Sequence, residues 1–316
     1  MSEDLFYNRD RNISGVVAPD LLSSLGLTPV YGSKVDFSIT TFSYETNDSY
    51  YNTIPSSLNS LKASYKMRYD VSEINAQKLT NFFESKSGHL DFVFSADNNV
   101  YRSVSGFCEN YAINHINNQH YEFATDVSVD QAPNSLNWSG MTFLNHTFQN
   151  FALSNSYKKY DIVYTGVNSN KLNNFYYCSG DHTSSAANSP TGLSSMWTQD
   201  FFFDPDISLQ NDVKLDVKKV EFKNSFVLRI KTKNNIAPVN LNYKFTDIND
   251  KQLKCMLHFL ENKAGYRRFR HQIPSVYNRP KVFMCPQWSH TWKYFNANDL
   301  DVSFIEDPLG VIPTDT

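Results

Sequence analysis

The sequence predicts an α+β fold that is predominantly β, in which two tandem copies of one strand-and-helix domain flank a small all-β module. The main observation is a repeat: a unit from Asp70 to Tyr111 returns without a gap from Asp247 to Trp288, 177 positions later (247 − 70 = 177). Between the copies the composition shifts to Asn, Ser, Thr and aromatic residues. A spacing this long exceeds the roughly 20 to 50 residues of solenoid repeats, so it indicates two copies of a whole domain.

Matching residues in register define the repeat. Asp70, Phe82, Glu84, Lys86, Gly88, Phe92, Arg102 and Cys108 recur as Asp247, Phe259, Glu261, Lys263, Gly265, Phe269, Arg279 and Cys285, and the hydrophobic Tyr111 recurs as Trp288. We interpret these as structural repeat positions. Glu84 and Lys86 lie two apart on the expected helix and do not face one another, so we expect solvated surface or contacts to a neighbouring subunit.

Each copy is expected to run strand, helix, strands. Tyr65, Met67 and Tyr69 alternate with polar residues, as in a strand with one buried face. Asp70 and Glu73 have capping-box spacing, and an apolar stripe follows, which predicts helices at 72–86 and 249–263. Gly88 and Gly265 are expected to end these helices in the left-handed conformation.

Similar short strands open the copies, Val35–Phe37 and Val220–Phe222, and prolines close them, Pro133 and Pro308. The predicted organisation is therefore an N-terminal arm (1–34), copy one (35–133), an insert (134–217), copy two (218–308) and a C-terminal tail (309–316). The arm carries a short apolar patch that includes Leu25 and Leu27. It either packs on a neighbouring subunit or folds back on its own domain.

Composition excludes several classes of function. The 316 residues carry 29 basic and 32 acidic residues, well mixed, which leaves no basic field for nucleic acid. No apolar run approaches the 18 or more residues needed to cross a bilayer, so no membrane insertion is expected. The four cysteines are isolated, which indicates neither a zinc site nor a disulfide framework. Cys108 and Cys285 are expected to be small buried hydrophobes, in a protein made in a reducing cytoplasm.

No catalytic motif is recognisable. The sequence lacks a Gly-x-Ser-x-Gly elbow, a His-Glu-x-x-His pair and a phosphate-binding Gly-rich loop. Asp181 beside His182 has no third partner to suggest a metal site. The chain is therefore not expected to be an enzyme or to need a cofactor, although a glycan depolymerase with paired carboxylates stays open, because the fold sets their separation.

The second copy resembles the phage minor tail protein M family of lambda-like long-tailed phages. The resemblance rests on Phe259-Leu260-Glu261 with Gly265 and Phe269, then on Pro274, Arg279, Val282, Cys285, Trp288, Val302 and Phe304. It implies a tail-tube-like domain in a tail-tip protein that forms a ring between the tail tube and the central hub. The unit is doubled here, so three chains could imitate a six-membered ring, and a hexamer of the doubled chain stays possible.

The central segment resembles a small carbohydrate-binding module of the chitin-binding type. The resemblance rests on Tyr157 to Tyr164, Asn174 to Cys178, Ser189-Pro190 and Trp197. It implies a glycan contact through Tyr160, Tyr164, Tyr176 and Trp197. For Tyr164, Tyr176 and Trp197 the favoured interpretation is instead the core of a very small domain, which needs large side chains to bury enough surface. The module is expected to project outward and to be dispensable for ring closure.

These observations lead to one principal functional expectation. The chain is predicted to be a structural component of the virion, at the tail tip or baseplate, assembled in the host cytoplasm. Its expected partners are its own copies in the ring, the tail tube and the hub or baseplate proteins. The alternative is a receptor-binding or glycan-binding tail protein that acts on a host surface glycan through the central module.

Overall fold

The computed structural model describes residues 25–45, 51–55, 61–96, 100–117, 120–130, 143–146, 148–165, 175–191, 196–205, 210–213, 217–221, 227–231, 239–273 and 280–307. The helices are α1 (Glu73–Lys86) and α2 (Asp250–Lys263). The strands are β1 (Lys34–Ile39), β2 (Thr41–Glu45), β3 (Tyr51–Pro55), β4 (Leu61–Val71), β5 (Phe92–Phe94), β6 (Val104–Asn117), β7 (His120–Asp130), β8 (Gln149–Asn150), β9 (Ser156–Tyr157), β10 (Ile162–Tyr164), β11 (Phe175–Cys178), β12 (His182–Thr183), β13 (Trp197–Thr198), β14 (Gln210–Val213), β15 (Val217–Glu221), β16 (Val227–Lys231), β17 (Val239–Ile248), β18 (Phe269–His271), β19 (Lys281–Tyr294) and β20 (Ala297–Glu306).

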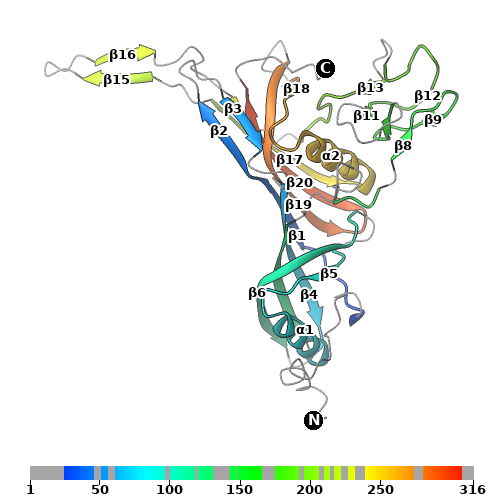
Figure 1. Cartoon of the computed structure of the whole chain (residues 1–316), viewed down its shortest axis with the longest axis vertical. Helices are drawn as coiled ribbons and strands as arrows, with labels where there is room; N and C mark the ends of the chain where they lie inside the picture. The colour runs from blue at the N-terminus through cyan, green and yellow to red at the C-terminus, as the bar shows by residue number, and fades with distance from the viewer. Residues whose placement is uncertain are drawn as a thin grey trace.

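The protein is predominantly β, with two helices. A ten-stranded antiparallel sheet runs in the order β14-β17-β20-β19-β1-β4-β7-β6-β5, and β18 pairs with β19 beside this path. A small mixed sheet, β13-β11-β10-β8, belongs to the central segment. Figure 1 shows two lobes, one with α1 below and one with α2 above, which β1 and β4 connect.

The same order of elements occurs in both lobes. The series β4-α1-β5-β6-β7 matches β17-α2-β18-β19-β20, and the bounds of α1, β5 and β6 return at α2, β18 and β19 with an offset of 177 residues. Strand pairing also matches, because β4-β7-β6-β5 corresponds to β17-β20-β19-β18. Even the register shifts recur, between Cys108 and Asn110 in β6 and between Met284 and Gln287 in β19.

The structural repeat begins earlier in copy two than the sequence predicts. β1 pairs with β4 and leads into the hairpin β2–β3, just as β14 pairs with β17 and leads into the hairpin β15–β16. The offset here is 176 residues (217 − 41 = 176). One extra residue in β17, at a register shift beside Asp247 with φ 55°, accounts for the change to 177.

This arrangement corrects the predicted start of copy two. Val220 and Glu221 lie in the hairpin β15–β16, so they are not the counterpart of Val35 and Asp36. β14 occupies that place instead, and both hairpins lie at the upper left of Figure 1. The sequence comparison was wrong because β-hairpin strands of similar composition look alike without their pairing partners.

The caps at both ends of the helices differ from the prediction. α1 begins after Ser72 and α2 after Asn249, whose side chain accepts a hydrogen bond from the Gln252 N–H, so the predicted capping by Asp70 and Asp247 is wrong. Ser87 and Ala264 are the left-handed C-cap residues, with φ of 50° and 47°. Gly88 and Gly265 follow them and also have positive φ, 72° and 69°.

The core lies between the large sheet and the helices. Alternate residues of the central strands, such as Tyr65, Phe123, Phe245 and Phe304, are buried and belong to one continuous hydrophobic cluster with residues of both helices. Leu25 and Leu27 pack against this cluster, so this part of the N-terminal segment folds back on its own chain. The apolar residues before 25 lie outside the described part of the chain.

Candidate assembly surfaces

The seam between the two copies is a continuous antiparallel ladder. β1, from copy one, pairs on one side with β4 and on the other with β19 of copy two, from Lys34 opposite Thr291 to Ser38 opposite Gln287. The ladder continues beyond β1, because the Gly32 N–H donates to the carbonyl of Trp292. One copy therefore joins the next by adding a strand to the open edge of its sheet.

Aromatic side chains fill this seam. Phe37 stacks on Trp288 with ring centroids 5.4 Å apart and planes inclined by 18°. Tyr101 packs edge-on against Trp292 at 5.6 Å, and its hydroxyl lies 2.8 Å from Nδ1 of His290. Trp288, a predicted repeat position, is thus a contact between the copies, whereas its counterpart Tyr111 packs within copy one on Phe83 and Phe123.

The polar partners of His290 determine its tautomer. The Asn298 amide nitrogen donates to the Ile248 carbonyl and to Asp250, so the Asn298 oxygen faces His290 and accepts from Nε2–H at 2.9 Å. His290 Nδ1 therefore accepts the hydrogen bond from the Tyr101 hydroxyl. Burial lowers the pKa of His290 to about 4, which keeps the ring neutral at physiological pH.

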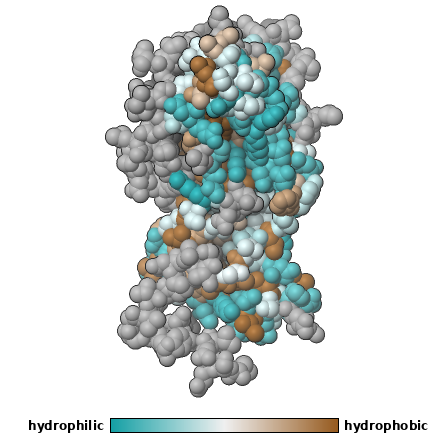
Figure 2. All heavy atoms as spheres, turned by 90° about the vertical axis from the view of Figure 1, so that its right-hand side faces the viewer, coloured by the Kyte–Doolittle hydropathy of each residue, from teal (hydrophilic) through white to brown (hydrophobic). Residues whose placement is uncertain are grey.

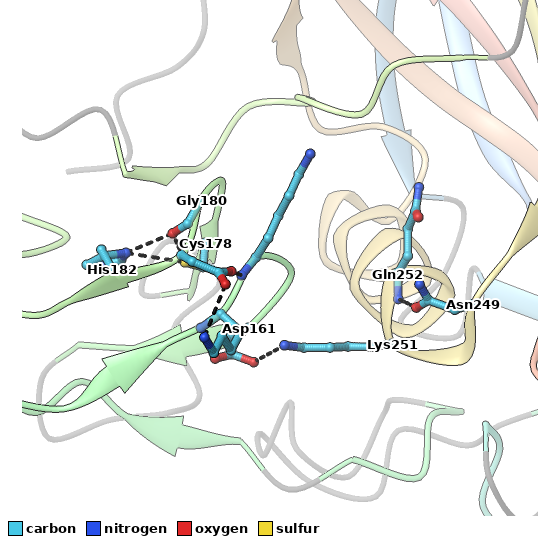
Figure 3. Close-up of polar contacts among 10 residues, drawn as sticks. Asp161, Cys178, Gly180, His182, Asn249, Lys251 and Gln252 are labelled. Atoms are coloured by element: carbon cyan, nitrogen blue, oxygen red, sulfur yellow. Dashed lines mark hydrogen bonds and ion pairs between the residues drawn. The ribbon is translucent and has the colours of Figure 1, made fainter.

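The central module packs on α2 rather than standing apart. Phe175 and Tyr177 belong to the same hydrophobic cluster as the helix, and the Tyr177 hydroxyl lies 3.1 Å from Nδ1 of His258. Burial lowers the pKa of His258 to about 3. Figure 3 shows a second connection at the helix N-terminus, where Asp161 of the module forms a 2.7 Å ion pair with Lys251. The expectation of an outward decoration is therefore revised: the module covers one face of copy two.

The predicted glycan-contact residues do not form one open aromatic surface. Trp197 is only 6% exposed and belongs to the module core with Tyr157 and Val163. Tyr160 stacks on Phe203 at 5.7 Å. Tyr164 and Tyr176 are partly buried, and each packs against a hydrophobic cluster. The residues that the sequence brings together are thus divided between two cores.

Near these residues, the contacts of Asp181 and His182 are structural. Asp181 accepts the Lys159 N–H at 2.7 Å and pairs with Lys158, while His182 Nδ1 lies 2.9 Å from the Gly180 carbonyl and 3.6 Å from Cys178 Sγ. Within the described ranges, no group of three or more His, Cys, Asp or Glu residues could hold a metal ion. No described helix is long and apolar enough to span a membrane.

Some structural repeat positions make equivalent contacts in both copies, and others do not. The ammonium of Lys86 lies 5.8 Å from the Phe82 ring, and that of Lys263 lies 5.4 Å from the Phe259 ring. Lys86 is buried, so the expectation of a solvated Lys86 is wrong: its ammonium lies over the ring one turn earlier. Glu84 contacts Tyr111, whereas Glu261 is buried and accepts the Phe143 N–H.

Cys108 and Cys285, two of the four buried cysteines, occupy matching bulges. Cys108 Sγ contacts the Asn110 carbonyl at 3.3 Å, and Cys285 Sγ contacts the Gln287 carbonyl at 3.4 Å. Burial raises the pKa of both thiols. Arg102 lies beside Phe143, to whose carbonyl its N–H donates, and Arg279 lies outside the described residues.

The sheet face opposite the helices is polar. A shallow groove of about 540 Å³ lies over the seam and is lined by residues of β1, β17, β19 and β20. Lys34 and Lys66 each hold Asp36 at 2.9 Å. Partial burial alone would raise the pKa of Asp36, but the hydrogen bonds from these lysines outweigh it and leave that pKa below its usual value. Such a neutralised network suits a solvated surface, and it carries no nucleophile paired with a base.

The described residues thus form no catalytic constellation, and the main contacts between parts of the chain lie along strand edges and seams. No family model matches the chain, and no curated protein matches it. The features that bear on function are therefore the repeat, the seam and the surfaces that they leave open.

Proposed function

We propose that the chain is a structural component of a bacteriophage tail tip or baseplate, where its copies form a ring that joins the tail tube to the hub. The observation that carries this proposal is the seam: copy one adds β1 to the edge of copy two, and the two equivalent units become one sheet. A chain built in this way supplies two adjoining, equivalent units of a ring. The resemblance of Phe259 to Trp288 to minor tail proteins directs the proposal to a phage tail.

The symmetry of the units favours a ring of three chains. Each chain supplies two equivalent wedges, so three chains supply six, which matches a six-membered neighbour on its axis. The expected mass is then about 109 kDa (3 × 36.4 kDa), against about 218 kDa for a hexamer. Light scattering on the purified protein distinguishes the two.

The two faces of the sheet also suit a ring. The helices and the central module cover one face, and the other carries charged and hydroxyl side chains such as Lys62, Ser64 and Asp126. Figure 2, which faces the side of the molecule that carries the central module in Figure 1, shows the two lobes joined at a narrower waist. A polar sheet face can line a water-filled channel.

A gene deletion tests the function in the particle. If the chain joins tube to hub, the deletion leaves particles with aborted or missing tails, and a tagged copy labels the tail tip in electron micrographs. Complete tails that fail to adsorb would instead indicate a receptor-binding protein. Complete, infectious tails would contradict both functions.

A further inference from the structure

The outer edge of β6 is the counterpart of the edge that β1 occupies on β19. In copy two, β18 pairs with the start of β19, at residues 281–283, and β1 pairs with residues 287–291. In copy one, β5 pairs with the start of β6, at residues 104–106. Among the described strands, none pairs with that edge of β6 at residues 110–114, the positions equivalent to 287–291 (287 − 177 = 110).

Side-chain exposure shows what the missing strand leaves open. His290 is 0% exposed beneath the contacts of copy one, whereas Ile113 at the equivalent position is 43% exposed. Likewise Trp292 is buried and its counterpart His115 is exposed. Copy one therefore presents an apolar, unpaired strand edge where copy two presents a filled seam, and unpaired edges of this kind readily add a strand.

The same chain carries the strand that fits this edge. β14 is the counterpart of β1: it pairs with β17 as β1 pairs with β4, from Gln210 opposite Asn242 to Val213 opposite Val239. β1 has a second partner, β19, whereas no described strand pairs with the other side of β14. The two open edges are therefore the two halves of the internal seam, separated onto opposite ends of the sheet.

We infer that β14 of one chain pairs with β6 of a second copy of the same chain and reproduces the internal seam between them. The repeat offsets give the register, because Lys34 opposite Thr291 becomes Gln210 opposite Asn114 (34 + 176 = 210; 291 − 177 = 114). Asn211 then lies opposite Ile113, Asp212 opposite Ala112 and Val213 opposite Tyr111. The inference deepens the ring-forming part of the proposed function and does not depend on a virion.

A second copy is the occupant that the geometry specifies. The contact joins two different surfaces, so it is heterologous, and it repeats from chain to chain until the ring closes. Each new seam has the strand direction and register of one that the chain already forms within itself. A partner of another sequence would leave β14 of the same chain still unpaired.

Cysteine cross-linking tests the register. Directly opposed residues of an antiparallel pair have Cα atoms about 4.5 to 5.5 Å apart, within the roughly 4.4 to 6.8 Å that disulfides span. The variant Asp212→Cys/Ala112→Cys should therefore give disulfide-linked oligomers on mild oxidation. The matched control Asp212→Cys/Ile116→Cys places the second thiol four residues away, about 13 Å along the strand, and should not. The native cysteines are all buried and should not contribute.

A charge substitution tests the surface without new thiols. Ile113→Lys puts an ammonium where the seam excludes water, and we expect self-association at least tenfold weaker with an unchanged melting temperature of the monomer. Ile116→Lys is the control, because the equivalent residue in copy two is Lys293, which stays at the surface in ion pairs with Asp247 and Asp299. It should associate normally.

Two results would overturn the inference. One is a folded double-cysteine protein without interchain disulfides at high concentration, or with as many in the control. The other is undiminished association of Ile113→Lys. Both experiments use purified protein, so a tail component that fails them keeps the proposed function and loses this interface, whereas a protein that passes them but is absent from virions keeps the interface and loses the tail function.

Discussion

The Tyr101 hydroxyl donates a 2.8 Å hydrogen bond to Nδ1 of His290, a residue 189 positions later that belongs to the other copy. His290 has no access to water, so no solvent molecule can replace the hydroxyl. Two similar pairs tie other parts together: Tyr177 with His258 joins the module to α2, and Tyr243 with His271 joins β17 to β18. Neutral histidines bonded to tyrosines thus recur where separate parts of the fold meet.

Removing the Tyr101 hydroxyl should destabilise the seam. In Tyr101→Phe the buried Nδ1 of His290 has no donor, and an unsatisfied buried polar atom costs about 1 to 3 kcal/mol of unfolding free energy. Urea denaturation of the variant and the native chain measures the difference. The control is Tyr294→Phe, whose hydroxyl contacts Asp247 at the surface and should matter little. Equal effects of the two substitutions would show that the seam bond contributes nothing special.

Gly265 should tolerate a side chain less well than Gly88. Both have positive φ, which costs on the order of 1 kcal/mol for a residue with a Cβ atom. A Cβ at Gly265 would also lie 2.4 Å from Cδ1 of Ile39, whereas the nearest atom to one at Gly88 is the Cys108 carbonyl oxygen at 3.6 Å. Gly265 is therefore both a backbone requirement and a contact, although the sequence indicated only the first.

The two glycines form a matched pair for measurement. Gly88→Ala should lose about 1 kcal/mol of unfolding free energy, and Gly265→Ala a further 1 to 3 kcal/mol from overpacking against β1. Adding Ile39→Ala to Gly265→Ala should recover part of the second loss, because it removes the atoms in the way. Indistinguishable melting temperatures for the two single variants would contradict the close approach.

Stability should fall as the pH decreases from about 6.5 toward 4.5. Burial is the main cause that lowers the pKa of His258 to about 3 and of His271 and His290 to about 4, while these groups titrate near 6.5 in the unfolded chain. In that window the unfolded state binds protons that the folded state does not, so the folded state loses stability as the pH falls. The stabilising contribution of these three neutral histidines is fully present above about pH 6.5.

Denaturant titrations at several pH values measure this dependence. Each such histidine adds up to about 1.4 kcal/mol per pH unit to the slope. Carboxylates whose pKa is lowered in the folded state, such as Glu122, begin to contribute in the same direction near pH 4.5, so the histidine contribution is read from the difference between the variant and the native chain. His258→Gln should reduce the slope by the contribution of one titrating histidine, up to about 1.4 kcal/mol per pH unit. A stability that does not change between pH 6.5 and 4.5 would show that the three rings are not held neutral.

Excising the central module should destabilise copy two. The module packs on α2 at His258, whose ring lies 4.6 Å from the Phe148 ring and 4.7 Å from the Phe175 ring, and without the module this buried ring would meet solvent. Replacing residues 145–204 with a short Gly-Ser bridge should therefore lower the melting temperature and expose a dye-binding hydrophobic surface. A deletion variant as stable as the full chain would instead support a dispensable module.

Part of this architecture is readable from local sequence. The alternation through Tyr65, Met67 and Tyr69 predicts a strand there, and the apolar stripes after it predict both helices to within one residue of their ends. The gapless match from Asp70 to Trp288 predicts the same order of elements twice. These features depend on periodicity and on residues close along the chain, and sequence carries that information directly.

Features that depend on strand pairing were decided by the tertiary structure. Composition matched Val220 to Val35. The structure places β14 beside β17 instead, because the pairing partner, not the composition, decides which strand of a repeat a segment corresponds to. For Trp197 the sequence left two interpretations, a sugar-stacking residue or part of a small core, and the structure places it in the module core. The seam, with Phe37 on Trp288 and Tyr101 on His290, joins residues more than 180 positions apart. No local pattern encodes such a contact, because it forms only where strand edges far apart in the chain lie side by side in one sheet.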